Sequence, residues 1–264
     1  WLPGPDGQPV MKGKARAASN FDTIAPGLTL NAWVQQMNEC MLAVDEGVGR
    51  LMTTLQETGQ FENTLVIYVA DQGYGLGEHG FNQKVAPYDA TIASPLILAR
   101  PDVIPTGKVC KQPVNAPDLM HYVCQSAQVN IPWGTHGRDI SPLIQEPDKA
   151  NWDSPMLFTH TARMYGNDTS VIPTDPEHLS PASNTPWYVM LRDGQYKYIR
   201  NLTPGETEEL YDLAADPEEL RNLAFVADQR ARLERLRSLA IAELRRTGAG
   251  FVDTMPVTRQ MQAK

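Results

Sequence analysis

The sequence predicts an α/β first part, with a partial parallel sheet flanked by helices, and then a small α+β part with an antiparallel sheet and a C-terminal helix. Three observations support this prediction: a helical apolar pattern over residues 30–58, two short apolar runs after it, and a hairpin signal at residues 193–194. The pattern changes at about residue 150, so we expect two domains, 1–150 and 151–264.

The first helix is predicted by apolar residues that recur at steps of three and four and so form one broad apolar stripe. Gly59 follows the stripe, where a glycine commonly ends a helix. We expect the methionines and the cysteine of the stripe to pack in a core rather than to bind a cofactor. The stripe consists of Leu30, Trp33, Val34, Met37, Cys40, Met41, Val44, Val48, Leu51, Met52 and Leu55.

The two apolar runs are residues 64–70 and 95–99. The first is rich in β-branched residues, and its length and flanks are typical of a strand buried on both faces of a parallel sheet. A glycine-rich loop connects the runs, and the order of helix, buried strand, loop and buried strand indicates an α/β part. Residues 1–28 are rich in glycine, proline and small polar residues, which predicts an irregular surface segment.

The second part contains shorter strand signals. Residues 156–158 and 187–191 predict strands, and Asp193-Gly194 predicts a tight turn from the second of these into residues 195–199. Adjacent strands joined by a tight turn must run antiparallel, so an antiparallel sheet is expected here.

Two further helices are predicted. One begins near Pro117, because proline is tolerated in the first turn of a helix. The acidic segment 216–219 (Asp-Pro-Glu-Glu) is suited to the start of another. Apolar spacing over residues 233–244 then continues a helix to about Arg246, with Gly248 after it.

Composition excludes several classes of function. The chain has 31 acidic and 23 basic residues and a net charge of −8, so no basic face for nucleic acid is expected. Its longest apolar run is far shorter than the roughly 20 residues that span a membrane. The three cysteines, Cys40, Cys110 and Cys124, are too few for a disulfide framework and fit no zinc spacing.

The residues that could carry chemistry come directly after the first apolar run. Asp71 and Gln72 follow that strand, and ligands of α/β sheets bind at the carboxyl ends of strands. Carboxylate and amide oxygens are ligands of Ca²⁺ and Mg²⁺. The glycines between residues 73 and 80 allow sharp turns and a close approach of the backbone to a ligand. The residues alone leave open the alternative of an ordinary turn after a strand.

The stretch from Asn63 to Gly80, together with Lys84 and residues 95–97, resembles the formylglycine-dependent sulfatases of the alkaline-phosphatase superfamily. The resemblance runs from about residue 28 to residue 225 and implies an alkaline-phosphatase-like fold. Other similar stretches follow in the family's order at residues 43–45, 48–51, 117–119, 137–143, 196–199, 209–213, 216–217 and 222–224.

The resemblance implies a role for each site residue. Asp71 corresponds to a ligand of the family's single divalent cation, Ca²⁺ rather than Mg²⁺, and Gln72 occupies the neighbouring ligand position. Lys84 corresponds to a catalytic lysine that contacts the sulfate and assists the leaving group, tasks that suit a compact ammonium. His79 either binds substrate at the rim of the pocket or braces the loop. His160 either faces the site from the second domain or is an ordinary histidine at the end of a strand.

Other parts of the family's site have no counterpart in this sequence. The family's nucleophile is a formylglycine made from a Cys-x-Pro-x-Arg or related motif, and none of the three cysteines lies in one. The family's first pair of metal aspartates is also missing. The chain therefore resembles the C-terminal half of a sulfatase, and we expect it to be inactive alone, to expose apolar area and to require the N-terminal half as a partner.

The family resemblance implies a small sulfated ester or a sulfated sugar as substrate, and a periplasmic, secreted or lysosomal location. Two alternatives remain. The chain could belong to a phosphonate monoester hydrolase or phosphodiesterase of the same superfamily, which shares the metal and the lysine. It could also be a non-catalytic fragment or pseudoenzyme with a structural or binding role.

Overall fold

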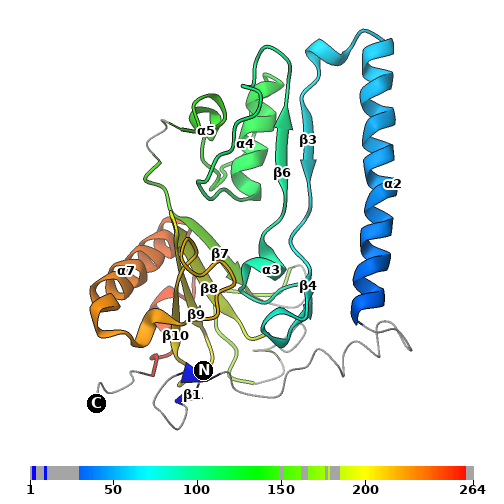
Figure 1. Cartoon of the computed structure of the whole chain (residues 1–264). Coiled ribbons are helices and arrows are strands. Elements are labelled where there is room, and N and C mark those ends of the chain that lie inside the picture. Colours follow the sequence, from blue (N-terminus) through cyan, green and yellow to red (C-terminus); the bar gives the residue numbers. More distant parts are fainter. Residues whose placement is uncertain are drawn as a thin grey trace. The chain divides into compact units, whose positions relative to one another are not determined.

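A computed structural model describes residues 2–3, 9–10, 30–148, 152–161, 166–175, 178 and 185–259 (Figure 1). By its contacts the chain forms two compact units: a small unit, Lys14–Lys108, and a large unit, Trp1–Gly13 with Val109–Lys264. This division does not coincide with residue 150, and the predicted domain boundary there stays a prediction.

The predicted irregular segment at the start of the chain lies outside the described residues, apart from two short strands. These are β1 (Leu2–Pro3) and β2 (Pro9–Val10), which pair antiparallel. Among the described residues, no helix is both long and apolar enough to cross a membrane.

The predicted first helix is confirmed as α2 (Leu30–Glu57), in the small unit. Its end is set by Gly59, whose φ of +67° is readily adopted only by glycine. The Gly59 N–H donates to the carbonyl of Gln56 (3.1 Å), and the Gln60 N–H donates to that of Leu55 (2.9 Å). These two bonds form a Schellman motif, which satisfies carbonyls that the helix itself leaves unpaired.

Part of the apolar stripe of α2 is exposed in the described structure. The exposed fraction is 41% for Val44 and 67% for Leu51, and Cys40 and Met41 are also exposed. The expected core packing of Cys40 and Met41 is therefore not found among the described residues. The exposure agrees with the expectation that this chain presents apolar area.

Both apolar runs form strands, but their pairing differs from the prediction. β3 (Val66–Val69) and β6 (Leu96–Ala99) lie side by side and pair antiparallel, with Val69 opposite Leu96 (Figure 1). The expected parallel arrangement is wrong for this pair because the connection returns to the carboxyl end of β3, whereas parallel neighbours need a crossover to the other end. Val69 and Ile97 are exposed, so the strands are not buried on both faces.

The large unit contains the predicted antiparallel sheet, with strand order β10-β9-β8-β7. Its strands are β7 (Met156–His160), β8 (Tyr188–Asp193), β9 (Tyr196–Asn201) and β10 (Glu208–Asp212). Asp193 pairs with Tyr196, so the turn consists of Gly194 and Gln195, one residue later than predicted. Gly194 has a φ of +57°, as a tight hairpin turn requires at its first central position.

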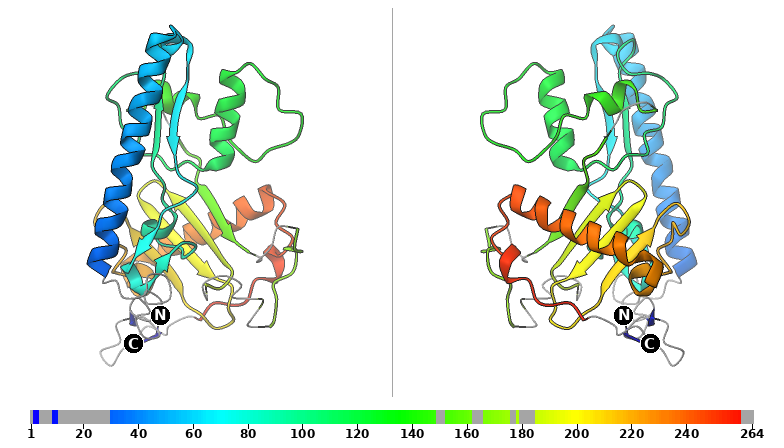
Figure 2. Two further views of the ribbon diagram at one scale, coloured as in Figure 1. Left: turned by 90° about the vertical axis from the view of Figure 1, so that its right-hand side faces the viewer. Right: turned by 90° about the vertical axis from the view of Figure 1, so that its left-hand side faces the viewer.

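Helix α7 (Arg230–Arg246) lies across one face of this sheet (Figure 2). It ends where predicted, and Gly248 follows with a φ of +72°. The core between helix and sheet consists of Trp187, Val189, Leu191, Tyr198, Leu202, Leu210, Leu233, Leu236, Ala240, Leu244 and Phe251. The four helix residues among these recur at steps of three and four, so one face of α7 is buried.

Helix α4 (Ala116–Ser126) confirms the prediction at Pro117. The buried carboxylate of Asp118 accepts the Asn115 N–H (3.0 Å) at the start of the helix. Its other oxygen accepts the Arg138 N–H (2.7 Å), which ties the segment before α5 (Ser141–Gln145) to α4. One buried carboxylate thus satisfies two backbone donors that lie far apart in the sequence, at residues 115 and 138.

The prediction that a helix starts at residues 216–219 is wrong. Asp216 accepts the N–H groups of Leu220 and Arg221 in a turn, and Glu219 has a φ of +56°. The Glu219 carboxylate lies 2.6 Å from the Lys197 ammonium, and both side chains are buried. A buried carboxylate must be paired, so this long-range contact overrides the local helix signal, and α7 begins only at Arg230.

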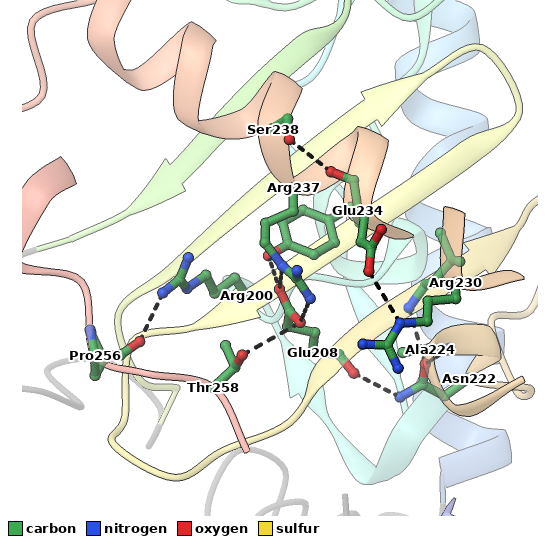
Figure 3. A network of polar contacts seen from close by, with 12 residues as sticks. Arg200, Glu208, Asn222, Ala224, Arg230, Glu234, Arg237, Ser238, Pro256 and Thr258 are labelled. Atoms are coloured by element: carbon green, nitrogen blue, oxygen red, sulfur yellow. Dashed lines mark hydrogen bonds and ion pairs between the residues drawn. The ribbon is translucent and has the colours of Figure 1, made fainter. Parts of the chain in front are cut away.

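A third buried carboxylate, that of Glu208, joins α7 to the edge strand β10 (Figure 3). Glu208 accepts two hydrogen bonds from Arg237, at 2.8 and 2.6 Å, and one from the Tyr198 hydroxyl. Nearby, the Arg200 guanidinium donates to the Pro256 carbonyl (2.8 Å). These contacts hold both the helix and the C-terminal segment on the sheet.

The buried carboxylate of Glu208 makes stability depend on pH. Burial alone raises the pKa of Glu208, but hydrogen bonds from Arg237 and Tyr198 outweigh it, and the net pKa lies below the ordinary 4.5. The contribution to stability is therefore present above the unfolded-state pKa and is lost as pH falls through the lower folded-state pKa. We expect Glu208→Gln to lower the free energy of unfolding by about 3 kcal/mol at pH 7.

Urea unfolding of the whole chain at pH 7 and at pH 4 tests this expectation. The difference between wild type and Glu208→Gln should shrink at the lower pH. Glu62→Gln, at an exposed position, is the control and should change little at either pH. An equal loss at both pH values would contradict the assignment.

A second prediction concerns Gly134 and Gly137, which precede α5. A Cβ on Gly137 would lie 2.1 Å from the carbonyl oxygen of Pro117, whereas one on Gly134 would meet open space. Because backbone atoms cannot move aside cheaply, Gly137→Ala should cost about 2 to 3 kcal/mol of unfolding free energy. Gly134→Ala should stay within about 0.5 kcal/mol of wild type in the same urea titration. Equal midpoints for the two variants would refute the close approach.

Candidate active site

The site residues follow the carboxyl end of β3 in the small unit. Asp71 comes two residues after the strand, and one of its carboxylate oxygens accepts the Gln72 N–H at 2.9 Å. A Cβ on Gly73 would lie 2.7 Å from the carbonyl oxygen of Ala93 and 2.8 Å from that of Ala90. Glycine is therefore required at residue 73, because the turn packs directly against the end of α3 (Asp89–Ile92).

A small hairpin brings the chain back toward Asp71. β4 (Gly75–Leu76) pairs with β5 (Asn82–Gln83), and a turn at Glu78–Gly80 connects them. The Leu76 N–H donates to the Glu78 carboxylate at 2.5 Å. Gly77 has a φ of +121° and Gly80 a φ of +74°, which bears out the prediction that the glycines permit sharp turns. Lys84 follows β5 directly.

The hairpin places the two main predicted residues in direct contact. The Lys84 ammonium lies 2.5 Å from the second carboxylate oxygen of Asp71. The hydrogen bond from Lys84 is the main cause of a lowered pKa of Asp71, so this carboxyl is ionised at neutral pH. The Asp71 side chain is 73% exposed and that of Lys84 39%, so both groups remain open to a ligand.

The backbone after Lys84 is held from the other side. Val85 has a φ of +79°, a conformation that is strained for a β-branched residue and persists only where its surroundings impose it. The buried Thr91 hydroxyl supplies part of this constraint, because it donates to the carbonyls of Ala86 and Tyr88, the latter at 3.0 Å. The position of the lysine is thus fixed by the packed segment that follows it.

His79 lies within the same loop and has a φ of +52°. Its ring stacks on the buried ring of Tyr88, with centroids 3.8 Å apart and an angle of 4° between the planes. This contact joins the hairpin to the segment after Lys84, as expected of a residue that braces the loop. Substrate binding by His79 stays a prediction.

A metal ion would find suitable donors here, but few of them. The carboxylate of Asp71 is exposed, and the amide oxygen of Gln72 has the right chemistry beside it. Among the described residues, no group of three or more histidine, cysteine, aspartate or glutamate side chains is gathered as metal ligands. Because Ca²⁺ takes six to eight oxygen ligands, these residues fit a share of such a site and not the whole.

Sequence reasoning missed the supports of the site. Tyr88, Thr91 and the strained Val85 fix the lysine, yet no periodic pattern in their segment singles them out. His160, the other candidate, belongs to the large unit, where its ring stacks on that of Tyr188 at 5.4 Å. Burial lowers the pKa of His160, and its role at the site stays a prediction.

Comparisons with known proteins show which family and which folds the chain is similar to. Residues 9–129 match the sulfatase family. The chain is 28% identical over 201 residues to an N-acetylglucosamine-6-O-sulfatase of Bacteroides thetaiotaomicron; the match covers 75% of this chain and 33% of that protein. The chain therefore spans about a third of the length of this relative.

Two solved structures are similar in fold. One, in complex with its substrate D-glucosamine-2-N,6-O-disulfate, has a TM-score of 0.63 and 24% identity, covering 80% of this chain and 40% of that one. The other is a phosphonate monoester hydrolase from Silicibacter pomeroyi, with a TM-score of 0.62 and 25% identity, covering 79% of this chain and 40% of that one. The fold is of the alkaline-phosphatase-like class, and the chain is similar to the sulfatase family over residues 9–129.

Proposed function

We propose that this chain forms the C-terminal portion of a metal-dependent sulfatase, which hydrolyses a sulfate ester. The observation that carries the proposal is the contact between Lys84 and Asp71 at the carboxyl end of β3, in a chain similar to the sulfatase family. The contact brings a hard anionic donor and a cationic donor to one place, as a site for a metal ion and an oxyanion requires.

Each residue has a distinct task in this proposal. Asp71 would hold the cation through its carboxylate, with the amide oxygen of Gln72 as a neighbouring ligand. When bound, the cation, Ca²⁺ rather than Mg²⁺, would neutralise charge on the sulfuryl oxygens. Lys84 would donate hydrogen bonds to a sulfate oxygen and stabilise the charge that develops on the leaving alcohol oxygen.

The nucleophile is proposed to come from the N-terminal half of the enzyme, as a formylglycine. The cysteines of this chain are at residues 40, 110 and 124, and none of them lies in the motif from which that residue is made. The isolated chain is therefore proposed to be inactive. The exposed stripe residues Val44 and Leu51, which lie on one face of α2, support a partner of this kind, since exposed apolar side chains on one face can mark an interface.

The substrate is proposed to be a sulfated sugar or a small sulfated ester. The names of the relative and of the solved complex, an N-acetylglucosamine-6-O-sulfatase and a glucosamine disulfate complex, support a sugar. The net charge of −8 repels such anions at long range, so attraction must come from the local cations of the site. A periplasmic, secreted or lysosomal location is proposed on family grounds alone.

The coding sequence upstream of this chain offers the first test. It should encode Cys-x-Pro-x-Arg or Cys-x-Ala-x-Arg. The protein that contains both this upstream part and the present chain, called the joined protein below, should release sulfate from glucosamine-6-sulfate or 4-nitrophenyl sulfate. Absence of the motif would refute the sulfatase and favour a non-catalytic role.

The likeness to a phosphonate monoester hydrolase makes that enzyme the second candidate. Both classes share a metal and a lysine, so the donor set seen here does not separate them. Rates on 4-nitrophenyl sulfate and on a phenylphosphonate monoester, measured with the same joined protein, separate them. A faster reaction with the phosphonate would replace the sulfatase proposal.

Substitution of the lysine gives a quantitative prediction. In the joined protein, Lys84→Gln should lower kcat for sulfate ester hydrolysis by roughly 10²- to 10⁴-fold, because the amide lacks the positive charge that stabilises the transition state. Lys111→Gln, at an exposed position, is the matched control and should leave kcat unchanged. A kcat for Lys84→Gln within about twofold of wild type would contradict the assigned role.

Substitution of the aspartate tests the metal. After treatment with EDTA, the joined protein should regain activity with Ca²⁺, and Asp71→Asn should raise the half-saturating Ca²⁺ concentration by roughly tenfold or more. Asp102→Asn is the control: Asp102 is exposed with a φ of +57°, which asparagine tolerates. Full activity of the EDTA-treated enzyme without added metal would disprove the proposal.

A further inference from the structure

The Asp71 carboxylate and the Lys84 ammonium of the proposed site are paired with each other. One oxygen of the Asp71 carboxylate accepts the Gln72 N–H at 2.9 Å, and the other lies 2.5 Å from the Lys84 ammonium. A cation needs the oxygen that the lysine holds. A sulfate needs the ammonium that the aspartate holds. The carboxylate thus has the position and charge that an oxyanion would have at Lys84.

The constraint on Lys84 makes this pairing selective. The strained backbone at Val85 and the buried Thr91 hydroxyl fix the chain directly after the lysine. The ammonium can therefore change partner only by rotation of its flexible side chain, over a short distance from Asp71. A cation at Asp71 would repel the ammonium and direct it to another anion nearby.

We propose that the Asp71–Lys84 ion pair keeps Lys84 from binding sulfate until a divalent cation takes the place of the ammonium at Asp71. The inference rests on the proposed function, because it names the regulation of the same site. Binding of cation and sulfate is then coupled, and by thermodynamic linkage each must raise the affinity for the other by the same factor, about 5- to 150-fold for typical couplings.

The test uses the 264-residue chain and needs no enzymatic activity. Lysine labelled with ¹³C at Cε gives an NMR signal for Lys84, which Lys84→Gln identifies by its loss. Inorganic sulfate is titrated without metal, with chloride at matched ionic strength as the reference. The signal of buried Lys197, paired with Glu219, reports that the large unit stays folded.

The proposal predicts different responses from three proteins. In wild type and in the control Asp102→Asn, sulfate should leave the Lys84 signal unchanged. In Asp71→Asn, sulfate should shift it, because the competing carboxylate charge is gone. Since the Asp71 side chain is 73% exposed, this substitution removes no core packing, and Asp71→Ala should behave in the same way. Addition of Ca²⁺ to wild type should move the Lys84 signal and permit the sulfate response.

The other outcomes separate the two proposals. A sulfate response of equal strength in wild type and Asp71→Asn would overturn the exclusion and leave the proposed function intact. If sulfate does not shift the Lys84 signal in any variant, the sulfate-binding role of Lys84 is contradicted, and so is the proposed function. A wild-type signal that does not move in 10 mM Ca²⁺ (a test concentration of about the upper range for weak sites) would overturn the action of the cation.

Discussion

The ion pair between Lys84 and Asp71 is the contact on which the proposed chemistry of this chain depends. The two residues are 13 positions apart, and the intervening hairpin must return in register for them to meet. Gly73 permits the turn to pack on α3, and the stack of His79 on Tyr88 joins the hairpin to the segment behind the lysine. An exposed ion pair contributes little stability by itself, so the loop holds the pair and not the reverse.

In the large unit, by contrast, ion pairs with buried groups contribute to stability. Two such pairs are Lys197 with Glu219, both buried, and the buried Glu208 with the partly exposed Arg237. Breaking such pairs is costly because the remaining charge stays buried. They therefore specify one arrangement of strands, helix and C-terminal segment, and no reacting group is needed to explain them.

The sequence predicted best where local rules decide the structure. The long apolar stripe of α2, the stop at Gly59 and the hairpin next to Gly194 each depend on residues close together in the chain, and all three form. Two predictions failed because distant residues decide the outcome. β6 pairs antiparallel with β3 because of the path of the whole connecting loop. Glu219 pairs with the distant Lys197, so the helix predicted to start at residues 216–219 does not form there.

At the candidate site, too, the sequence predicted some features and left others to the folded structure. The motif predicts that Asp71 and Lys84 belong to one site, and the structure places the two side chains in contact, while their roles stay a prediction. The spacing could not reveal that the two groups neutralise each other, nor that Val85 adopts a positive φ beside them. Both features arise from packing around Tyr88 and Thr91, which only the folded chain contains.

Two deficits of the small unit have one physical explanation. Among the described residues its metal donors are too few for a Ca²⁺ shell, and apolar side chains on one face of α2, such as Val44 and Leu51, are exposed. A small ligand could supply the missing oxygens but could not cover a helix face, and a purely apolar partner could do only the reverse. A further protein segment would supply both, since a protein surface can carry carboxylates and apolar side chains together. The proposed N-terminal half is such a segment, which is why the cation, the aspartate and the cover of α2 are best regarded as parts of one assembly.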